Sequence, residues 1–162
     1  MLNLKIHLGQ GISRGDRMDY AIQKAVELGV HEITPVITQF SQLKADEKQI
    51  AKKLLHWEGI IIAAAEQSGR CVIPTLHPPR PFAQWMAQPA EHKFICHPTA
   101  QAHHLKKETQ SVRVAIGPEG GFHENEVQLA QTHQASVLSL GPRILRTETA
   151  TVVALTLLQF CL

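Results

Sequence analysis

Two glycine-rich segments near the end of the chain contain the residues best suited to bind a small polar ligand. The first reads IGPEGGF over residues 116–122, and the second reads LGPRILRTETA over residues 140–150. Each follows a short apolar run and precedes an apolar pattern of helical spacing, which predicts a turn from a strand into a helix. Two such turns can surround one ligand with backbone N–H and C=O groups, since glycine allows close approach to the main chain. The sequence therefore predicts a binding site built largely from backbone.

The first segment matches neither of the common phosphate-binding motifs. GPEGG is not GxGxxG, and no lysine follows it as in GxxxxGK[ST]. Gly117, Gly120 and Gly121 permit positive φ angles, so a tight turn with glycines for conformation alone explains this loop as well as a ligand does. A nucleotide phosphate is a poor candidate for the ligand.

The second segment adds side chains that can react or recognise a substrate. Ile144 and Leu145 are apolar residues in a loop, where such residues cover a flat apolar group such as adenine, or a partner subunit. Arg143 and Arg146 flank them, and Glu148 follows. Surface arginines that pair with Glu148 or with water are the simplest interpretation. An anionic or carbonyl-bearing substrate explains two donors beside a ligand loop better.

The elements that position these segments alternate between strand-like and helix-like patterns. The expected strands are 4–8, 32–38, 71–76, 93–96, 111–116 and 136–140, and the expected helices are 16–28, 46–68, 82–87, 124–133 and 147–162. Residues 9–15 are predicted to be a loop, and Pro35 indicates a sheet edge or a bulge. This order predicts one α/β domain with a largely parallel sheet. Ligands of such sheets bind beyond the carboxyl ends of the strands, where both glycine segments fall.

The composition fits an ordinary globular domain. The chain has 162 residues, 44% of them hydrophobic and 19% charged. Its longest apolar runs, such as residues 60–65, are far too short to span a membrane, and no export signal is visible. Cys71, Cys96 and Cys161 form no CxxC pair, which favours a reducing, cytosolic compartment. We therefore expect a cytoplasmic protein with no membrane partner.

Neither the net charge nor the histidine content of the chain indicates a polyanionic partner or a bound metal. The formal net charge is only +2, so any nucleic acid would have to meet a local arginine patch. Ten histidines are present, and His92, His97, His103 and His104 lie closest to one another. Their spacings match no zinc pattern. We expect surface histidines and no bound metal.

Four motifs in sequence order resemble one known family. The two glycine segments, together with QKAVELGVHEITPV (residues 23–36) and AAAEQSGR (residues 63–70), closely resemble the RsmE family of bacterial 16S ribosomal RNA uridine methyltransferases, in the SPOUT superfamily. The resemblance runs from about Leu4 to the end of the chain. It implies that residues 1–162 are a SPOUT methyltransferase domain with a C-terminal deep trefoil knot. S-adenosyl-L-methionine is then the methyl donor, a homodimer the working unit, and 16S rRNA of the small ribosomal subunit the partner, in ribosome biogenesis.

The resemblance also implies two departures. Members of the family carry an N-terminal PUA-like RNA-binding domain, which we expect this chain to lack, and this leaves the RNA affinity and activity of the chain alone open. His123 stands where a serine often caps the helix, and histidine is expected to be the weaker cap.

Site residues follow from the resemblance. Three loops are expected to hold the donor, through His97, Pro98, Gly117, Glu119, Gly120, Gly121, Leu140, Gly141, Ile144 and Leu145. The acceptor is N3 of a uracil ring, which must lose a proton, and a guanidinium aimed at a ring oxygen stabilises the resulting anion. Arg146 is given that role, and Arg143 orients the base or a phosphate. Glu148 accepts the proton or holds the arginine. Arg70 is a further candidate for RNA contact.

Two other functions remain open at this stage. The same fold and donor could serve another RNA base or a ribose hydroxyl. The chain could also be a non-catalytic, RNA-associated dimerisation module. Helix 147–162 is apolar on both faces, which fits contact with a second subunit or the central helix of a monomer.

Overall fold

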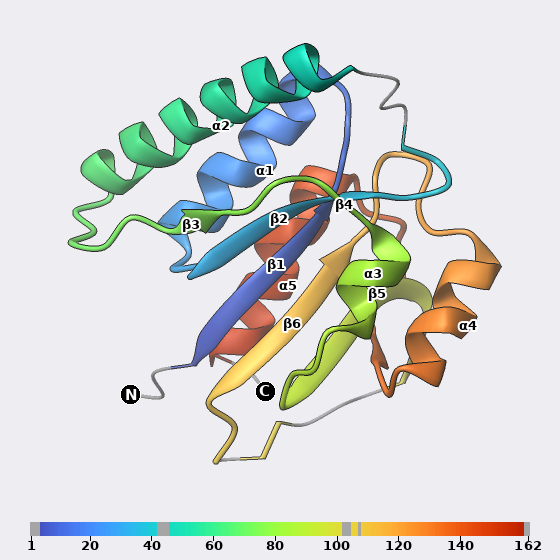
Figure 1. The fold of residues 1–162 in the computed structure, drawn as a ribbon. Helices are drawn as coiled ribbons and strands as arrows, with labels where there is room; N and C mark the ends of the chain where they lie inside the picture. The colour runs from blue at the N-terminus through green and yellow to red at the C-terminus, as the bar shows by residue number, and fades with distance from the viewer. Residues whose placement is uncertain (1–3, 42–45, 102–104, 107, 161–162) are drawn as a thin grey trace.

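Figure 1 shows the computed structural model, which describes residues 4–41, 46–101, 105–106 and 108–160. His103, His104, Cys161 and Leu162 lie outside the described residues. The strands are β1 (Lys5–Gly11), β2 (Glu32–Ile37), β3 (Thr75–Leu76), β4 (Arg80–Pro81), β5 (His92–Gln101), β6 (Ser111–Ile116) and β7 (Ser136–Leu138). The helices are α1 (Gly15–Glu27), α2 (Glu47–Gln67), α3 (Phe82–Ala87), α4 (Glu124–Thr132) and α5 (Thr147–Phe160). No helix among these residues is long and apolar enough to cross a membrane.

The strands form one sheet in the order β3-β2-β1-β6-β5-β7, with β4 also beside β2. All of the described pairings are parallel, which confirms the predicted α/β class with a mostly parallel sheet. Pro35 was expected at an edge or a bulge. It lies in the gap between the pairing of β2 with β3, which ends at Ile33, and the pairing with β4, which begins at Val36. A residue without an N–H costs least in such a gap.

Helices cover both faces of the sheet (Figure 1). One face packs against α1, α2 and α5, and α3 and α4 cover the other. Side chains alternate along β1, so consecutive residues lie on opposite faces of the sheet. Ile6 and Leu8 point into the core beneath α1 and α5. His7 and Gly9 point toward α3, where a Cβ atom on Gly9 would lie 2.7 Å from the Trp85 ring, so only glycine lets that ring pack on the strand.

Helix ends follow from local hydrogen bonds. Asp46 caps α2, because its Oδ1 accepts from the N–H of Gln49 at 2.9 Å. His123 caps α4 in a comparable way: its Nδ1 accepts from Asn125 N–H at 3.1 Å, and the N–H of His123 donates to Glu126 at 3.0 Å. Histidine therefore makes a complete capping box here, which the sequence did not lead us to expect.

Three strands differ from the prediction. β1 runs to Gly11, so part of the expected loop 9–15 is strand. The expected strand 71–76 is reduced to β3, only two residues long. β5 runs past the predicted end at Cys96, but its pairing with β7 shifts there, since Cys96 and Gln101 both oppose Leu138. Residues 97–100 thus form an irregularity in the pairing of β5 with β7.

Candidate functional site

A cavity of about 450 Å³ lies at the carboxyl ends of β5, β6 and β7. All of the predicted donor-binding residues line it, namely His97, Pro98, Gly117, Glu119, Gly120, Gly121, Leu140, Gly141, Ile144 and Leu145. Arg143 and Arg146 line it too, as does Arg17 from the first turn of α1, which the sequence did not single out. The irregularity in β5, the turn after β6 and the turn after β7 therefore close around one space.

The turn after β6 has its shape because glycines let the chain approach itself and its neighbours. The N–H of Gly121 donates to Pro118 O at 2.8 Å, and the φ of Gly121 is 74°. A Cβ on Gly117 would lie 3.1 Å from the carbonyl carbon of Gly121, and one on Gly120 would lie 2.9 Å from Cβ of Phe40. Of the three glycines predicted to allow positive φ, only Gly121 adopts it; the other two are required for close contact.

A buried polar network joins both glycine turns to β1. The hydroxyl of Thr147 donates to Gly117 O at 2.6 Å and accepts from Gln10 Nε2 at 3.0 Å. Thr151 donates to Gln10 Oε1 at 2.6 Å. Because Gln10 is fully buried, these bonds satisfy an amide that would otherwise be costly to bury. A glutamine inside the buried strand LKIHLGQG was the only sequence signal for this network.

The walls of the cavity combine main-chain polar groups with apolar side chains. Ile116, Phe122, Leu140, Leu145 and Ala150 provide apolar surface. At the rim Ile144 is 89% exposed, which is unusual for a large aliphatic side chain. A flat ligand with polar edges fits this combination.

Two ionisable groups in the wall have perturbed acidity. Burial raises the pKa of Glu119, but hydrogen bonds from the backbone, including Arg14 N–H at 3.1 Å, and from the Ser13 hydroxyl outweigh it, so the pKa lies below its usual value. Glu119 is thus a carboxylate that ties the turn after β6 to the segment after β1. Burial raises the pKa of the Cys96 thiol, which stays neutral.

The predicted catalytic residues are divided between the cavity and its surroundings. Arg143 and Arg146 are exposed at the cavity and make no ion pair with any described residue. Glu148 does not line the cavity; its Oε2 is buried and has no hydrogen-bond partner in the described part of the chain. A buried carboxylate oxygen of this kind is costly unless a further group reaches it.

Arg70 lies away from this cavity. Its guanidinium donates to Val26 O at 3.1 Å and to Val30 O at 2.8 Å, next to the end of α1. Burial lowers its pKa, although arginine stays charged. These bonds give Arg70 a structural role, and the geometry lends no support to RNA contact.

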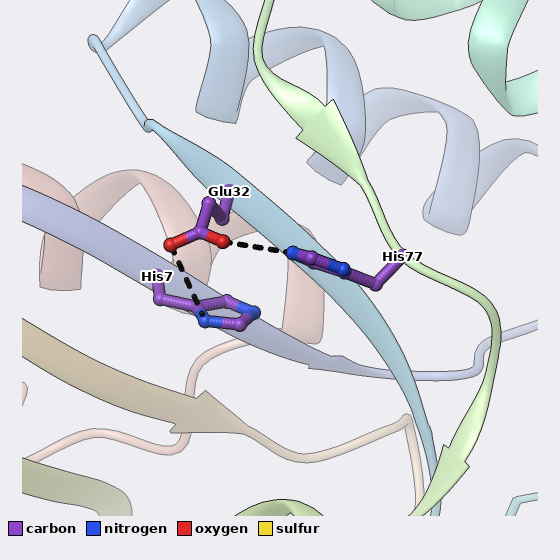
Figure 2. Close-up of side chains that lie close together, drawn as sticks. All are labelled: His7, Glu32 and His77. Atoms are coloured by element: carbon purple, nitrogen blue, oxygen red, sulfur yellow. Dashed lines mark hydrogen bonds and ion pairs between the residues drawn. The ribbon is translucent and has the colours of Figure 1, made fainter. Parts of the chain in front are cut away.

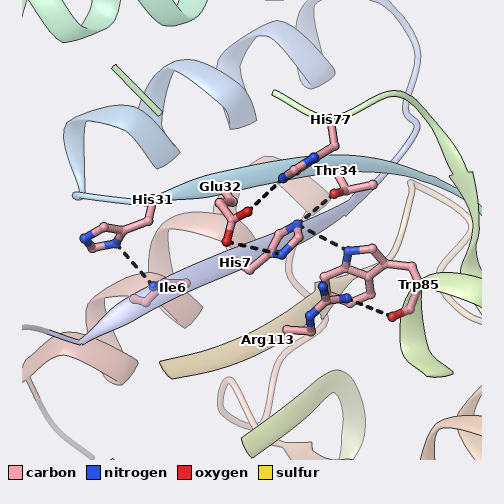
Figure 3. A network of polar contacts seen from close by, with 8 residues as sticks. All are labelled: Ile6, His7, His31, Glu32, Thr34, His77, Trp85 and Arg113. Carbon is pink, nitrogen blue, oxygen red and sulfur yellow. Dashed lines mark hydrogen bonds and ion pairs between the residues drawn. The ribbon is translucent and has the colours of Figure 1, made fainter. Parts of the chain in front are cut away.

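A second group of titratable side chains lies on the α3 face (Figure 3). It comprises His7, Glu32 and His77, with Trp85 and Arg113 beside them. Burial first and the charge of Arg113 second lower the pKa of His7 to about 4, although the Glu32 carboxylate opposes the shift. His7 is therefore neutral at physiological pH. The sequence analysis missed this group, because its members meet only through sheet pairing.

Comparison with known proteins identifies relatives along almost the whole chain. The RNA methyltransferase domain family matches residues 1–159. Ribosomal RNA small subunit methyltransferase E of Buchnera aphidicola is 39% identical over 160 residues, covering 96% of this chain and 65% of the relative. The protein of the same name from Bacillus subtilis is 33% identical, covering 98% of this chain and 67% of the relative. The chain thus spans about two thirds of the length of these relatives.

Two solved structures have nearly the same fold. A methyltransferase from Legionella pneumophila in complex with SAM has a TM-score of 0.92 and 46% identity, covering 97% of this chain and 66% of that one. Ribosomal RNA small subunit methyltransferase E from Neisseria gonorrhoeae, bound to S-adenosyl methionine, has a TM-score of 0.88 and 36% identity, covering 96% and 65%.

Proposed function

This chain belongs to the RNA methyltransferase domain family, and we propose that it transfers a methyl group from S-adenosylmethionine to N3 of a uridine in 16S ribosomal RNA of the small subunit. One observation carries the proposal. The three segments assigned to the donor line a single cavity, and two arginines without described ion pairs lie at the same cavity.

The residues present fit S-adenosylmethionine as the donor. Gly117, Gly120 and Gly121 line the cavity and have no side chain, so their main-chain groups are open to a ligand there. Leu140 and Leu145 offer apolar surface to an adenine, while Ile144 gains cover that it otherwise lacks. When bound, the donor supplies an electrophilic methyl group on a sulfonium. The protein contributes the position of that group and excludes water from it.

At the acceptor, Arg146 is assigned to stabilise negative charge on the uracil. N3 gives up its proton as it forms the bond to the methyl carbon, while the bond from that carbon to sulfur breaks and its electron pair stays on sulfur. A guanidinium beside a ring oxygen lowers the activation barrier of methyl transfer, because it stabilises the negative charge that develops on that oxygen. Arg143 orients the base or a phosphate. Glu148 is assigned to accept the proton or to hold the arginine, and either role requires its buried Oε2, which has no partner among the described residues, to turn toward the cavity.

A basic hollow beside the donor cavity supports RNA as the substrate. The hollow has a volume of about 600 Å³ and is lined by Lys52, Lys53 and His56 of α2 together with the start of α1. Arg17 of α1 lines the donor cavity, while Asp19 of that helix pairs with His56 in the hollow, so the positive charge of the hollow comes from Lys52 and Lys53. A phosphate backbone favours such a surface.

The proposal includes a deep trefoil knot in the C-terminal third of a SPOUT domain. β7 pairs with β5 at one end of the strand order, whereas α5 packs against α1 and β6. The chain between β7 and α5 must therefore return past the turn after β6, and Thr147 bonds to Gly117 at that crossing.

We also propose a cytoplasmic homodimer. The buried side of α5 carries Ala154, Leu155 and Leu158. On its other side Val153 and Leu157 are half-buried and Phe160 is 71% exposed. A second subunit would cover this apolar side.

Replacing Arg146 with Ala tests the catalytic assignment. Methylation of small subunits by the Arg146→Ala variant should fall about 10²–10³-fold in kcat, the usual cost of losing a donor to a developing anion. S-adenosylmethionine affinity, measured by calorimetry, should stay close to wild type. Arg80→Ala removes an exposed arginine that does not line the cavity and serves as the control. Wild-type turnover in Arg146→Ala would remove the assignment.

The two alternatives give different results in the same experiments. A non-catalytic dimerisation module would give no heat with S-adenosylmethionine. A methyltransferase for another RNA position would bind the donor, and mass spectrometry of the methylated RNA would place the methyl group elsewhere than on uridine N3.

A further inference from the structure

Three potential metal ligands converge on one face of the sheet (Figure 2). They are His7 from β1, Glu32 from the start of β2 and His77 from the segment after β3. One ligand atom from each residue lies within 4.8 Å of the others.

The pairing of the strands brings these residues together. His7 is opposite Glu32 in the parallel pairing of β1 with β2, so the two side chains point to the same face. Leu76 is opposite Ile33, and the N–H of His77 donates to Ile33 O at 2.9 Å, which continues the pairing by one residue. The convergence is thus fixed by three backbone segments and does not depend on one flexible side chain.

Neighbouring groups orient the ligands. The Nε2 atom of His7 lies 2.7 Å from the Thr34 hydroxyl, which turns Nδ1 toward Glu32 at 3.7 Å. The other carboxylate oxygen of Glu32 lies 2.8 Å from Nε2 of His77. Trp85 forms a wall beside the His7 ring, at 5.3 Å between centroids in an edge-on arrangement (Figure 3). A metal-binding histidine usually donates its other ring N–H to an outer acceptor, and the Thr34 hydroxyl is placed to be that acceptor for His7.

We propose that His7 Nδ1, the Glu32 carboxylate and His77 Nε2 bind a zinc ion, with water as the fourth ligand. Zinc bonds of about 2.0–2.1 Å place neighbouring ligand atoms about 3.4 Å apart in a tetrahedron. The distance from the Glu32 carboxylate to His7 Nδ1, 3.7 Å, is longer than that value, and the distance to His77 Nε2, 2.8 Å, is shorter. Zinc on Nδ1 puts the proton of His7 on Nε2, where Thr34 accepts it. The hydrogen bond from Trp85 Nε1–H to His7 Nε2, at 3.4 Å, is lost when zinc binds, because Nε2 of His7 then carries a proton.

The chemistry of the group selects zinc over magnesium or calcium. Two of the three ligands are imidazole nitrogens, whereas Mg²⁺ and Ca²⁺ require oxygen ligands. Arg113 and Arg80 oppose a cation here, since their charges act on His7. Only an ion with strong bonds to nitrogen overcomes that repulsion. The side chains of Glu32 and His77 are 45% and 33% exposed, which gives the ion a path of entry.

The zinc would fasten the segment 68–81 onto β1 and β2. That segment has only the two short strands β3 and β4, so a metal bond through His77 adds a strong tie to a lightly paired stretch. The donor cavity shares no residue with this site. Zinc binding should therefore leave S-adenosylmethionine affinity unchanged.

Spectroscopy and thermal unfolding of the chelator-treated protein test the proposal. Co²⁺ should give one equivalent of a tetrahedral visible spectrum per chain, and Zn²⁺ should displace it. Zn²⁺ at about 100 times its Kd should raise Tm by about 5–10 °C. Glu32→Gln and His77→Ala should each weaken binding by more than the roughly 10–100-fold that loss of an outer contact costs. His77 is partly exposed, so its removal should leave the fold intact.

His56→Ala provides the matched control. His56 lies 2.9 Å from Asp19, so it forms a surface histidine–carboxylate pair outside the three-residue group. It should bind the ions as wild type does. The proposal is overturned if the wild type gives no tetrahedral spectrum, if either ligand variant binds as tightly as wild type, or if His56→Ala alone abolishes binding. Donor calorimetry on the same samples reports the methyltransferase assignment separately.

Discussion

Replacing Thr147 with Val tests whether one hydroxyl holds the donor cavity together. Valine keeps the shape but removes the bond to Gly117 O, at 2.6 Å, and the bond from Gln10 Nε2, at 3.0 Å. Loss of the hydrogen bond to Gly117 O costs about 1 kcal/mol. The buried side-chain amide of Gln10 loses a hydrogen-bond acceptor, which costs a further amount of about 1–3 kcal/mol. Gln10 Nε2 retains only Gly11 O at 3.5 Å, so the penalty applies. The free energy of unfolding should fall by about 2–4 kcal/mol.

Urea denaturation of Thr147→Val and Thr156→Val measures the effect against a matched control. Thr156 lies in the same helix, and its hydroxyl donates only to Val152 O at 2.8 Å, one turn earlier. Such a local bond adds little, so Thr156→Val should change stability by less than about 1 kcal/mol. Thr147→Val should also weaken S-adenosylmethionine binding, because it frees the Gly117 carbonyl. Equal midpoints for the two variants would refute the reasoning.

Two further predictions concern β1 and its surroundings. Gly11→Ala should destabilise the fold by about 1–3 kcal/mol and weaken donor binding, because the added Cβ would lie 2.5 Å from Pro118 N. Gly59→Ala, in an open position of α2, should instead stabilise by about 0.5–1 kcal/mol, and thermal melts distinguish the two. The low pKa of His7 means that the unfolded chain binds a proton near pH 6.5 while the folded chain binds it near pH 4. Stability should therefore fall by about 3 kcal/mol across that window as pH decreases, and a pH series of urea melts should be flatter for His7→Gln.

The sequence was sufficient where local patterns determine structure. Alternating apolar runs, helical spacing and glycine turns predicted the sheet, α2, and the two turns that line the donor cavity. Arg143 and Arg146 lie where the loop pattern placed them.

What failed depended on contacts between distant segments. Residues 9–11, expected in a loop, are strand because they pair with β2 and β6, which are distant in sequence. Arg70 stays a predicted candidate for RNA contact, but its hydrogen bonds to the carbonyls of residues 26 and 30 are contacts that no local pattern reveals. The group of His7, Glu32 and His77 was missed for the same reason, because the spacing of histidines along the chain does not show which strands pair.

Hydrogen–deuterium exchange with and without S-adenosylmethionine tests the central claim most directly. The account predicts that the donor protects backbone amides in segments 96–98, 116–122 and 140–147, the three stretches around the cavity, and leaves the segment 68–81 unchanged. Protection confined to other segments, or none at saturating donor, would contradict a donor site formed by the turns after β6 and β7.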